Sequence, residues 1–251
     1  MRFQTRLWVA AMVASFLWSS GAAATPSGFT EDFSGGGMPA SMEDVSSPAG
    51  TTTWTGSATF SGSRHFVRTI SSDYNTVSFT FEGTVTLGGT SISSLAWLGM
   101  GEGVNSGRMY FPQGPFVGAE VGPVGFDNGF VRMTDYHVTS GATGTSGLLG
   151  NGNGGWGLGT VHRVRMTWDH VAQSATIGLD QGYDGVTYVE DFTHTLVGSD
   201  NGFTAANSHL FFGGSGDVSF DDLVVTVVPE PSTALLLGMG LAGLGMRRRA
   251  G

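Results

Sequence analysis

The 251-residue chain contains no cysteine and no lysine. Without cysteine it can form no disulfide and use no thiol in catalysis, so the fold must depend on its core and on any bound metal. Two hydrolase motifs are also missing, because neither Gly-x-Ser-x-Gly nor His-Glu-x-x-His occurs. No stretch between the two ends has a sustained helical period. These absences favour an all-β protein without a recognisable catalytic motif.

The first 24 residues have the three parts of a secretory signal peptide. Arg2 and Arg6 supply positive charge, residues 7–17 are apolar, and the alanines at 22–24 suit a cleavage site. We therefore predict an exported protein whose signal peptide, residues 1–24, is removed.

The last 24 residues, 228–251, form a second tripartite segment. A rigid Pro-Glu-Pro triplet is followed by an uncharged run at 231–246 and by three arginines. At 1.5 Å per residue, a helix of that run would be about 24 Å long, which is short for a hydrocarbon core of about 30 Å. The residues that define the segment are Pro229, Glu230, Pro231, Arg247, Arg248 and Arg249.

This combination resembles the PEP-CTERM sorting signal that exosortases handle in Gram-negative bacteria that make exopolysaccharide. The resemblance implies recognition at the Pro-Glu-Pro triplet and removal of the tail during export. It also implies brief contact of the hydrophobic sorting helix with the inner membrane as a transmembrane helix, and a final place at the cell surface or in the extracellular matrix. The alternative is an ordinary C-terminal tail anchor.

The body between the two signals is a single predicted domain, residues 25–227. It is strongly acidic, because it carries six of the eleven arginines and nineteen of the twenty acidic residues, a formal charge of −13. Such a charge disfavours nucleic acid as a partner. The chain's 42 glycines and eight prolines suit many short strands joined by turns.

Alternating apolar and polar residues predict about a dozen strands. The pattern is clearest at 75–87, and residues 161–180 are predicted to form a hairpin. Further predicted strands are 52–60, 65–70, 95–100, 116–121, 130–138, 186–192, 209–212 and 219–227. So many strands in one domain predict an all-β, antiparallel two-sheet sandwich.

The hairpin, the closing strand and the opening segment 29–33 resemble concanavalin A-like or laminin G-like jelly rolls. The resemblance implies a lectin-like β-sandwich in which the first and last strands pair. Another sandwich or a β-barrel is the alternative.

Paired carboxylates are the first candidates for chemistry in such a fold, since retaining glucanases of this type carry Glu-x-Asp-x-(x)-Glu on one strand. No such run occurs here. Glu190–Asp191 and Asp221–Asp222 are adjacent pairs, and adjacent side chains on a strand point to opposite faces. We therefore predict that the protein is not an enzyme and has no catalytic residues; convergence of carboxylates from different strands is the alternative.

Calcium is the one cation that the pattern allows, because jelly rolls often hold it with oxygen ligands near strand ends. The weak candidates are Glu31, Asp32, Asp217, Asp221 and Asp222, with solvated acids as the alternative. No other cofactor is expected.

Residues 140–160 are predicted to form a long glycine-rich loop. Its Trp156 is a candidate platform for a sugar ring, or a side chain that pins the loop to the sandwich.

Together these features predict an exported, exosortase-processed protein that is non-catalytic and associated with extracellular polysaccharide. The alternatives are a secreted glycan hydrolase with a scattered carboxylate site and a structural matrix protein without a specific ligand.

Overall fold

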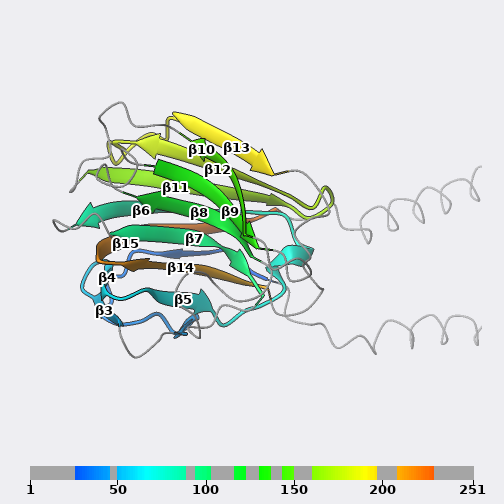
Figure 1. Ribbon diagram of the computed structural model, residues 1–251. Coiled ribbons are helices and arrows are strands. Elements are labelled where there is room, and N and C mark those ends of the chain that lie inside the picture. Colours follow the sequence, from blue (N-terminus) through cyan, green and yellow to red (C-terminus); the bar gives the residue numbers. More distant parts are fainter. Residues whose placement is uncertain are drawn as a thin grey trace, which may run out of the picture.

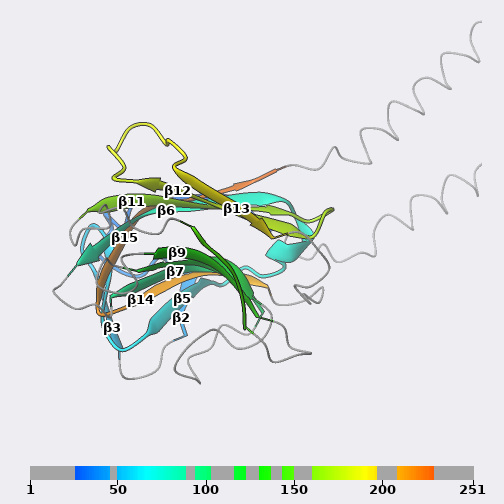
Figure 2. The same cartoon turned by 45° about the horizontal axis from the view of Figure 1, so that its top comes forward.

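The computed structural model describes residues 26–45, 50–88, 94–102, 116–122, 130–136, 143–149, 160–196 and 208–228. These residues form two antiparallel sheets that lie face to face (Figures 1 and 2). The all-β sandwich predicted from the sequence is therefore confirmed.

The larger sheet has eight strands within these ranges. In spatial order it consists of β13 (Phe192–Leu196), β12 (Ser174–Gln181), β11 (Val161–Asp169), β6 (Phe79–Gly88), β15 (Asp217–Val227), β4 (Ala58–Gly62) and β3 (Gly50–Trp54). The short β1 (Phe29–Glu31) pairs with β15 outside this path, with Glu31 opposite Leu223. The first and last strands therefore pair, as the resemblance to jelly rolls implied.

The smaller sheet has seven strands in the described residues. Their order is β10 (Thr143–Leu149), β9 (Phe130–Tyr136), β8 (Phe116–Gly122), β7 (Leu95–Gly101), β14 (His209–Ser215), β5 (His65–Thr69) and β2 (Met42–Asp44). A single-turn 3₁₀ helix, η1 (Tyr74–Thr76), precedes β6.

The core lies between the two sheets. It consists of the inward-facing residues, which occupy every second position along each strand. Phe60, Phe212 and Phe220 form its aromatic centre, with ring centroids 5.3 to 5.8 Å apart. Trp168 is fully buried and its indole N–H donates to the carbonyl of Asn75 at 3.2 Å. Aromatic pairs at this spacing stabilise a core beyond their buried area, which suits a chain without disulfides.

A second apolar cluster lies on the outer face of the seven-stranded sheet. It consists of Phe66, Leu95, Trp97, Phe116 and Phe211. These residues alternate along β5, β7, β8 and β14 with residues of the inter-sheet core, so they point the opposite way. Trp97 is buried within this outer cluster, and the Arg64 guanidinium lies 4.8 Å from its ring centroid.

Three predicted segments differ from the structure. The stretch 52–60 is a hairpin rather than one strand, because Gly56 takes a left-handed φ of 69° and the Thr55 N–H donates to the Ser57 carbonyl. The predicted loop 140–160 contains β10, which pairs with β9 despite a sequence of weak strand propensity. The predicted strand 186–192 is irregular up to residue 191, and β13 begins at Phe192.

Candidate functional site

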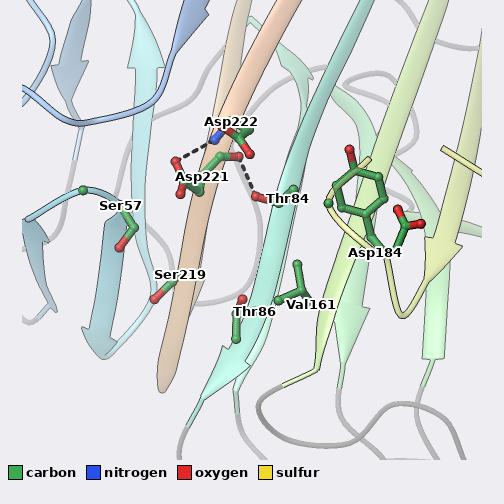
Figure 3. Close-up of a pocket in the computed structure, with 11 residues that line it drawn as sticks. Ser57, Thr84, Thr86, Val161, Asp184, Ser219, Asp221 and Asp222 are labelled. Carbon is green, nitrogen blue, oxygen red and sulfur yellow. Dashed lines mark hydrogen bonds between the residues drawn. The ribbon is translucent and has the colours of Figure 1, made fainter. Parts of the chain in front are cut away.

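A pocket of about 520 Å³ lies on the outer face of the eight-stranded sheet (Figure 3). Its floor comes from β6 and β15, whose inward residues fill the core while Thr84, Thr86 and Ser219 face outward. Gly56 and Ser57, in the turn between β3 and β4, lie on one side. Val161, Tyr183, Asp184 and Gly185 lie on the other.

A β-bulge in β15 brings two carboxylates into this pocket. The register between β15 and β6 shifts between Asp221, opposite Thr84, and Val224, opposite Glu82. Asp222 takes a left-handed φ of 47° in the bulge, and Asp221 and Asp222 both line the pocket. The expectation that this adjacent pair points to opposite faces is wrong here, because the extra residue of a bulge breaks the alternation of the strand.

Local hydrogen bonds hold the Asp221 carboxylate and the backbone of the bulge. The Asp222 N–H donates to Asp221 Oδ1 at 2.8 Å, and the Thr84 hydroxyl donates to the Asp221 carbonyl at 2.9 Å (Figure 3). Burial raises the pKa of Asp221, and the neighbouring charges of Asp222 and Asp32 add to the increase. The backbone N–H groups of Thr187 and Val186 lower the pKa of the exposed Asp184.

The conformation of Asp222 gives a prediction about stability. Because a side chain in the left-handed region costs about 1 kcal/mol, Asp222→Gly should be neutral or raise the free energy of unfolding by under about 1 kcal/mol. Asp222→Val should lower it by about 1–2 kcal/mol, since β-branched residues tolerate this region poorly. Urea unfolding of both variants measures the difference, and equal stability of the two would contradict the left-handed bulge.

The wall of the pocket belongs to the segment between β12 and β13, residues 182–191, which stands above the eight-stranded sheet in Figure 2. Its turns are closed by aspartates: Asp184 Oδ1 accepts from the N–H groups of Val186 and Thr187, and Asp180 Oδ2 accepts from that of Val189. Such side-chain bonds compete with strand pairing, which explains why the predicted strand at 186–192 does not form.

Cation–π contacts fix the 182–191 segment to the sheet. The guanidinium carbon of Arg165 lies 3.7 Å from the ring centroid of Tyr188, and that of Arg163 lies 5.3 Å from the ring centroid of Tyr183. Burial raises the pKa of Tyr188, and the charge of Glu190 raises it further. A Cβ at Gly178 would lie 2.6 Å from Glu190 Oε2 and close to the Tyr188 hydroxyl, so these side chains would have to move. The pocket wall is therefore a braced structure.

Glu82 holds the two arginines in place. One carboxylate oxygen accepts from Arg163 at 3.1 Å and the other from Arg165 at 2.7 Å. Burial alone would raise the pKa of Glu82, but the two arginines outweigh burial and lower it. Glu82 thereby positions both tyrosine-binding arginines from the centre of the sheet.

The weak calcium candidates do not all come together. Pairing of β1 with β15 places Asp32 near Asp221, as their electrostatic interaction shows. Glu31 and Asp32, however, accept from the N–H groups of Phe33 and Ser34 in their own turn. Asp217 begins β15, about 13 Å along the strand from Asp221.

No group of three or more metal-ligating side chains is found in the described parts of the chain. Calcium binding stays a prediction.

Glu190 and Asp191, the other adjacent pair, both lie before β13 and are exposed. Asp191 Oδ2 accepts from the Gln181 N–H at 2.7 Å, so this carboxylate closes the base of the 182–191 segment. Trp156 and the sorting residues Pro229, Glu230, Pro231, Arg247, Arg248 and Arg249 lie outside the described residues.

Most of the residues that line the pocket were not predicted from the sequence. The outward hydroxyls Thr84, Thr86 and Ser219 are visible in the alternation of their strands, and this signal could have marked the floor. Tyr183 and Asp184 have no comparable signal, because they follow the hairpin in an irregular segment.

Comparison with solved structures defines the class of fold. A xylan β-1,4-xylosidase from Bacillus halodurans C-125 superposes with a TM-score of 0.56 at 9% identity, over 78% of this chain and 38% of that one. Lectin I-B4 from Griffonia simplicifolia, in a metal-free form, gives 0.52 at 15% identity, over 81% and 100%. A seed lectin of Lotus tetragonolobus gives 0.51 at 12%, over 81% and 100%. The body is a concanavalin A-like jelly roll.

A comparison with protein-family models identifies a sorting signal at the C-terminal end of the sequence. Residues 227–249 match the PEP-CTERM protein-sorting motif. The chain is therefore an exported protein of the Gram-negative cell envelope that carries the signal for exosortase processing. A sequence comparison with curated proteins finds no match. Within the described ranges, no helix is both long and apolar enough to cross a membrane.

Proposed function

We propose that the body of this exported protein binds extracellular polysaccharide and performs no chemistry on it. The pocket on the eight-stranded sheet carries this proposal. Its size suits a small-ligand site, and it combines hydroxyl and carboxylate groups with the ring of Tyr183, the groups that sugars require. The lectin neighbours support the proposal by analogy of fold.

Export and processing are tested on cells with and without the exosortase. We expect an intact mass that lacks residues 1–24 and the tail after about residue 229, and recovery of this form in the extracellular polymer only when the exosortase is present. A full-length protein in the inner membrane of both strains would indicate a tail anchor instead.

Polysaccharide binding is tested by co-sedimentation with the insoluble polymer fraction of the same cells. We expect saturable retention that an excess of soluble polysaccharide abolishes. Retention that no polysaccharide competes would leave a structural matrix protein as the better description.

A glycan hydrolase is the second candidate, and one observation favours it. Asp221 and Asp222 share the pocket with Asp184, and the raised pKa of Asp221 is the direction that a general acid needs. Release of reducing ends from a polysaccharide panel, lost in Asp221→Asn, would establish this candidate. Binding without such release would support the non-catalytic proposal.

A further inference from the structure

The pocket has a charge pattern that selects among polysaccharides. Among the described residues, eleven line the pocket; three of them are the acidic residues Asp184, Asp221 and Asp222, and none is an arginine or histidine. The two nearby arginines, Arg163 and Arg165, are turned to Glu82 and to the tyrosine rings. An anionic sugar would therefore meet three acidic residues, while the nearest arginine, Arg163 opposite Thr84, is bound to Glu82 and covered by Tyr183.

The same groups suit a neutral sugar. Carboxylates accept hydrogen bonds and cannot donate when ionised, so they pair with ligand hydroxyls that donate. The hydroxyls of Ser57, Thr86 and Ser219 can each donate or accept, whereas that of Thr84 already donates to the Asp221 carbonyl and can only accept. Tyr183 adds an aromatic ring to the wall. A sugar ring presents several hydroxyls around an apolar face, and this pocket offers partners for both.

The lining residues are held before any ligand arrives. Ser219 is hydrogen-bonded to Thr59 at 2.9 Å, Thr84 to the Asp221 carbonyl at 2.9 Å, and Tyr183 lies against Arg163. Side chains ordered in this way lose little freedom when a ligand binds, which favours affinity. The bulge at Asp222 contributes in another way, because a bulge redirects the side chains of its strand and here turns two acidic residues toward the pocket.

From these observations we propose that the pocket between the β3–β4 turn and the 182–191 segment binds an uncharged sugar residue of the polysaccharide and excludes uronic acids. The inference rests on the proposed function and makes it specific in two ways. It assigns binding to the outer face of the eight-stranded sheet, and it assigns the ligand to the neutral sugars.

Two pairs of variants test the assignment of the site. Thr86→Phe fills the floor of the pocket, and Thr80→Phe is its matched control, because Thr80 lies on the same strand and face, is also half-buried, and lines no part of the pocket. Asp221→Asn removes one pocket charge, and Asp217→Asn removes an exposed charge at the start of the same strand. Thermal unfolding of all four establishes that they fold.

The probes are soluble neutral glucan, mannan and galactan against polygalacturonate and alginate, titrated onto the full-length chain by calorimetry. We expect binding to at least one neutral polymer, a loss of tenfold or more in Thr86→Phe and Asp221→Asn, and changes under twofold in the two controls. Neutral-polymer binding that survives in both pocket variants would overturn the assigned site and leave polysaccharide binding standing. Binding to the uronic acid polymers alone would overturn the assigned ligand. Failure to bind any polymer would overturn the proposed function itself.

Discussion

Replacing Glu82 with alanine should lower the free energy of unfolding by about 3 kcal/mol, which is near the lower end of the cost of breaking a buried ion pair. The Glu82 side chain is 16% exposed and is held between Arg163, which is 10% exposed, and Arg165. Its removal leaves the buried Arg163 guanidinium without its carboxylate partner. Urea unfolding at pH 7 measures the loss.

The loss should extend to the pocket wall, because Arg163 and Arg165 carry the tyrosines of the 182–191 segment. Faster amide hydrogen exchange in that segment would show it. The contribution of Glu82 to the free energy of unfolding should also disappear in acid. The pKa of Glu82 is lowered in the folded state, so its contribution is present above its unfolded value near 4.5 and is lost as the pH falls below it.

Glu43→Ala is the matched control. Glu43 accepts from Arg68 at 2.6 Å, but its side chain is 43% exposed and that of Arg68 is 25% exposed. A solvated pair of this kind contributes at most about 1 kcal/mol. Equal losses in the two variants would mean that burial of the Glu82 pair adds nothing.

The sequence predicts the sandwich well because the strands follow a simple rule. Along β6 and β11 the apolar residues alternate, and this alternation alone puts Phe81, Val85, Met166 and Trp168 on one face, which is the face that the structure buries. Two sheets can pack face to face when every second residue of each strand is apolar, and the sequence shows this pattern directly. The pairing of β1 with β15 required more, since nothing within residues 29–31 specifies a partner almost 200 residues away. It came from the resemblance to jelly rolls.

The pocket could not be predicted in the same way, because it depends on departures from the rule. The alternation places Asp221 and Asp222 on opposite faces, and a single bulge residue with positive φ reverses that result. The carboxylates of Asp180 and Asp184 bind the backbone N–H groups of residues 186, 187 and 189, which the sequence pattern assigns to a strand. Local side-chain bonds of this kind depend on three-dimensional geometry that periodicity does not contain.

His162 should make the protein sensitive to mild acid, with a total effect of about 3 kcal/mol. The imidazole is fully buried on the inward face of β11, and burial lowers its pKa to about 4. Nδ1 accepts a hydrogen bond from the Gly182 N–H at 3.2 Å, so a proton added there would also break this contact. The folded state therefore prefers the neutral ring.

The direction of the pH dependence follows from this preference. The unfolded chain binds the proton near its ordinary value of 6.5, whereas the folded chain resists it down to about 4. The contribution of His162 is therefore complete above about pH 6.5 and is lost as the pH falls toward 4, with about 2 kcal/mol gone by pH 5.

His162→Gln isolates this contribution, because glutamine does not titrate and every other group cancels when the two proteins are compared at one pH. Urea unfolding at pH 7.5 and pH 5.0 should show that the wild type loses about 2 kcal/mol more than the variant between these values. The same loss in both proteins would place the acid sensitivity elsewhere. His209, whose pKa burial also lowers, is the first residue to test in that case. Gly182 begins the 182–191 segment, so protonation of His162 would also remove one of the hydrogen bonds that hold this segment to the sheet.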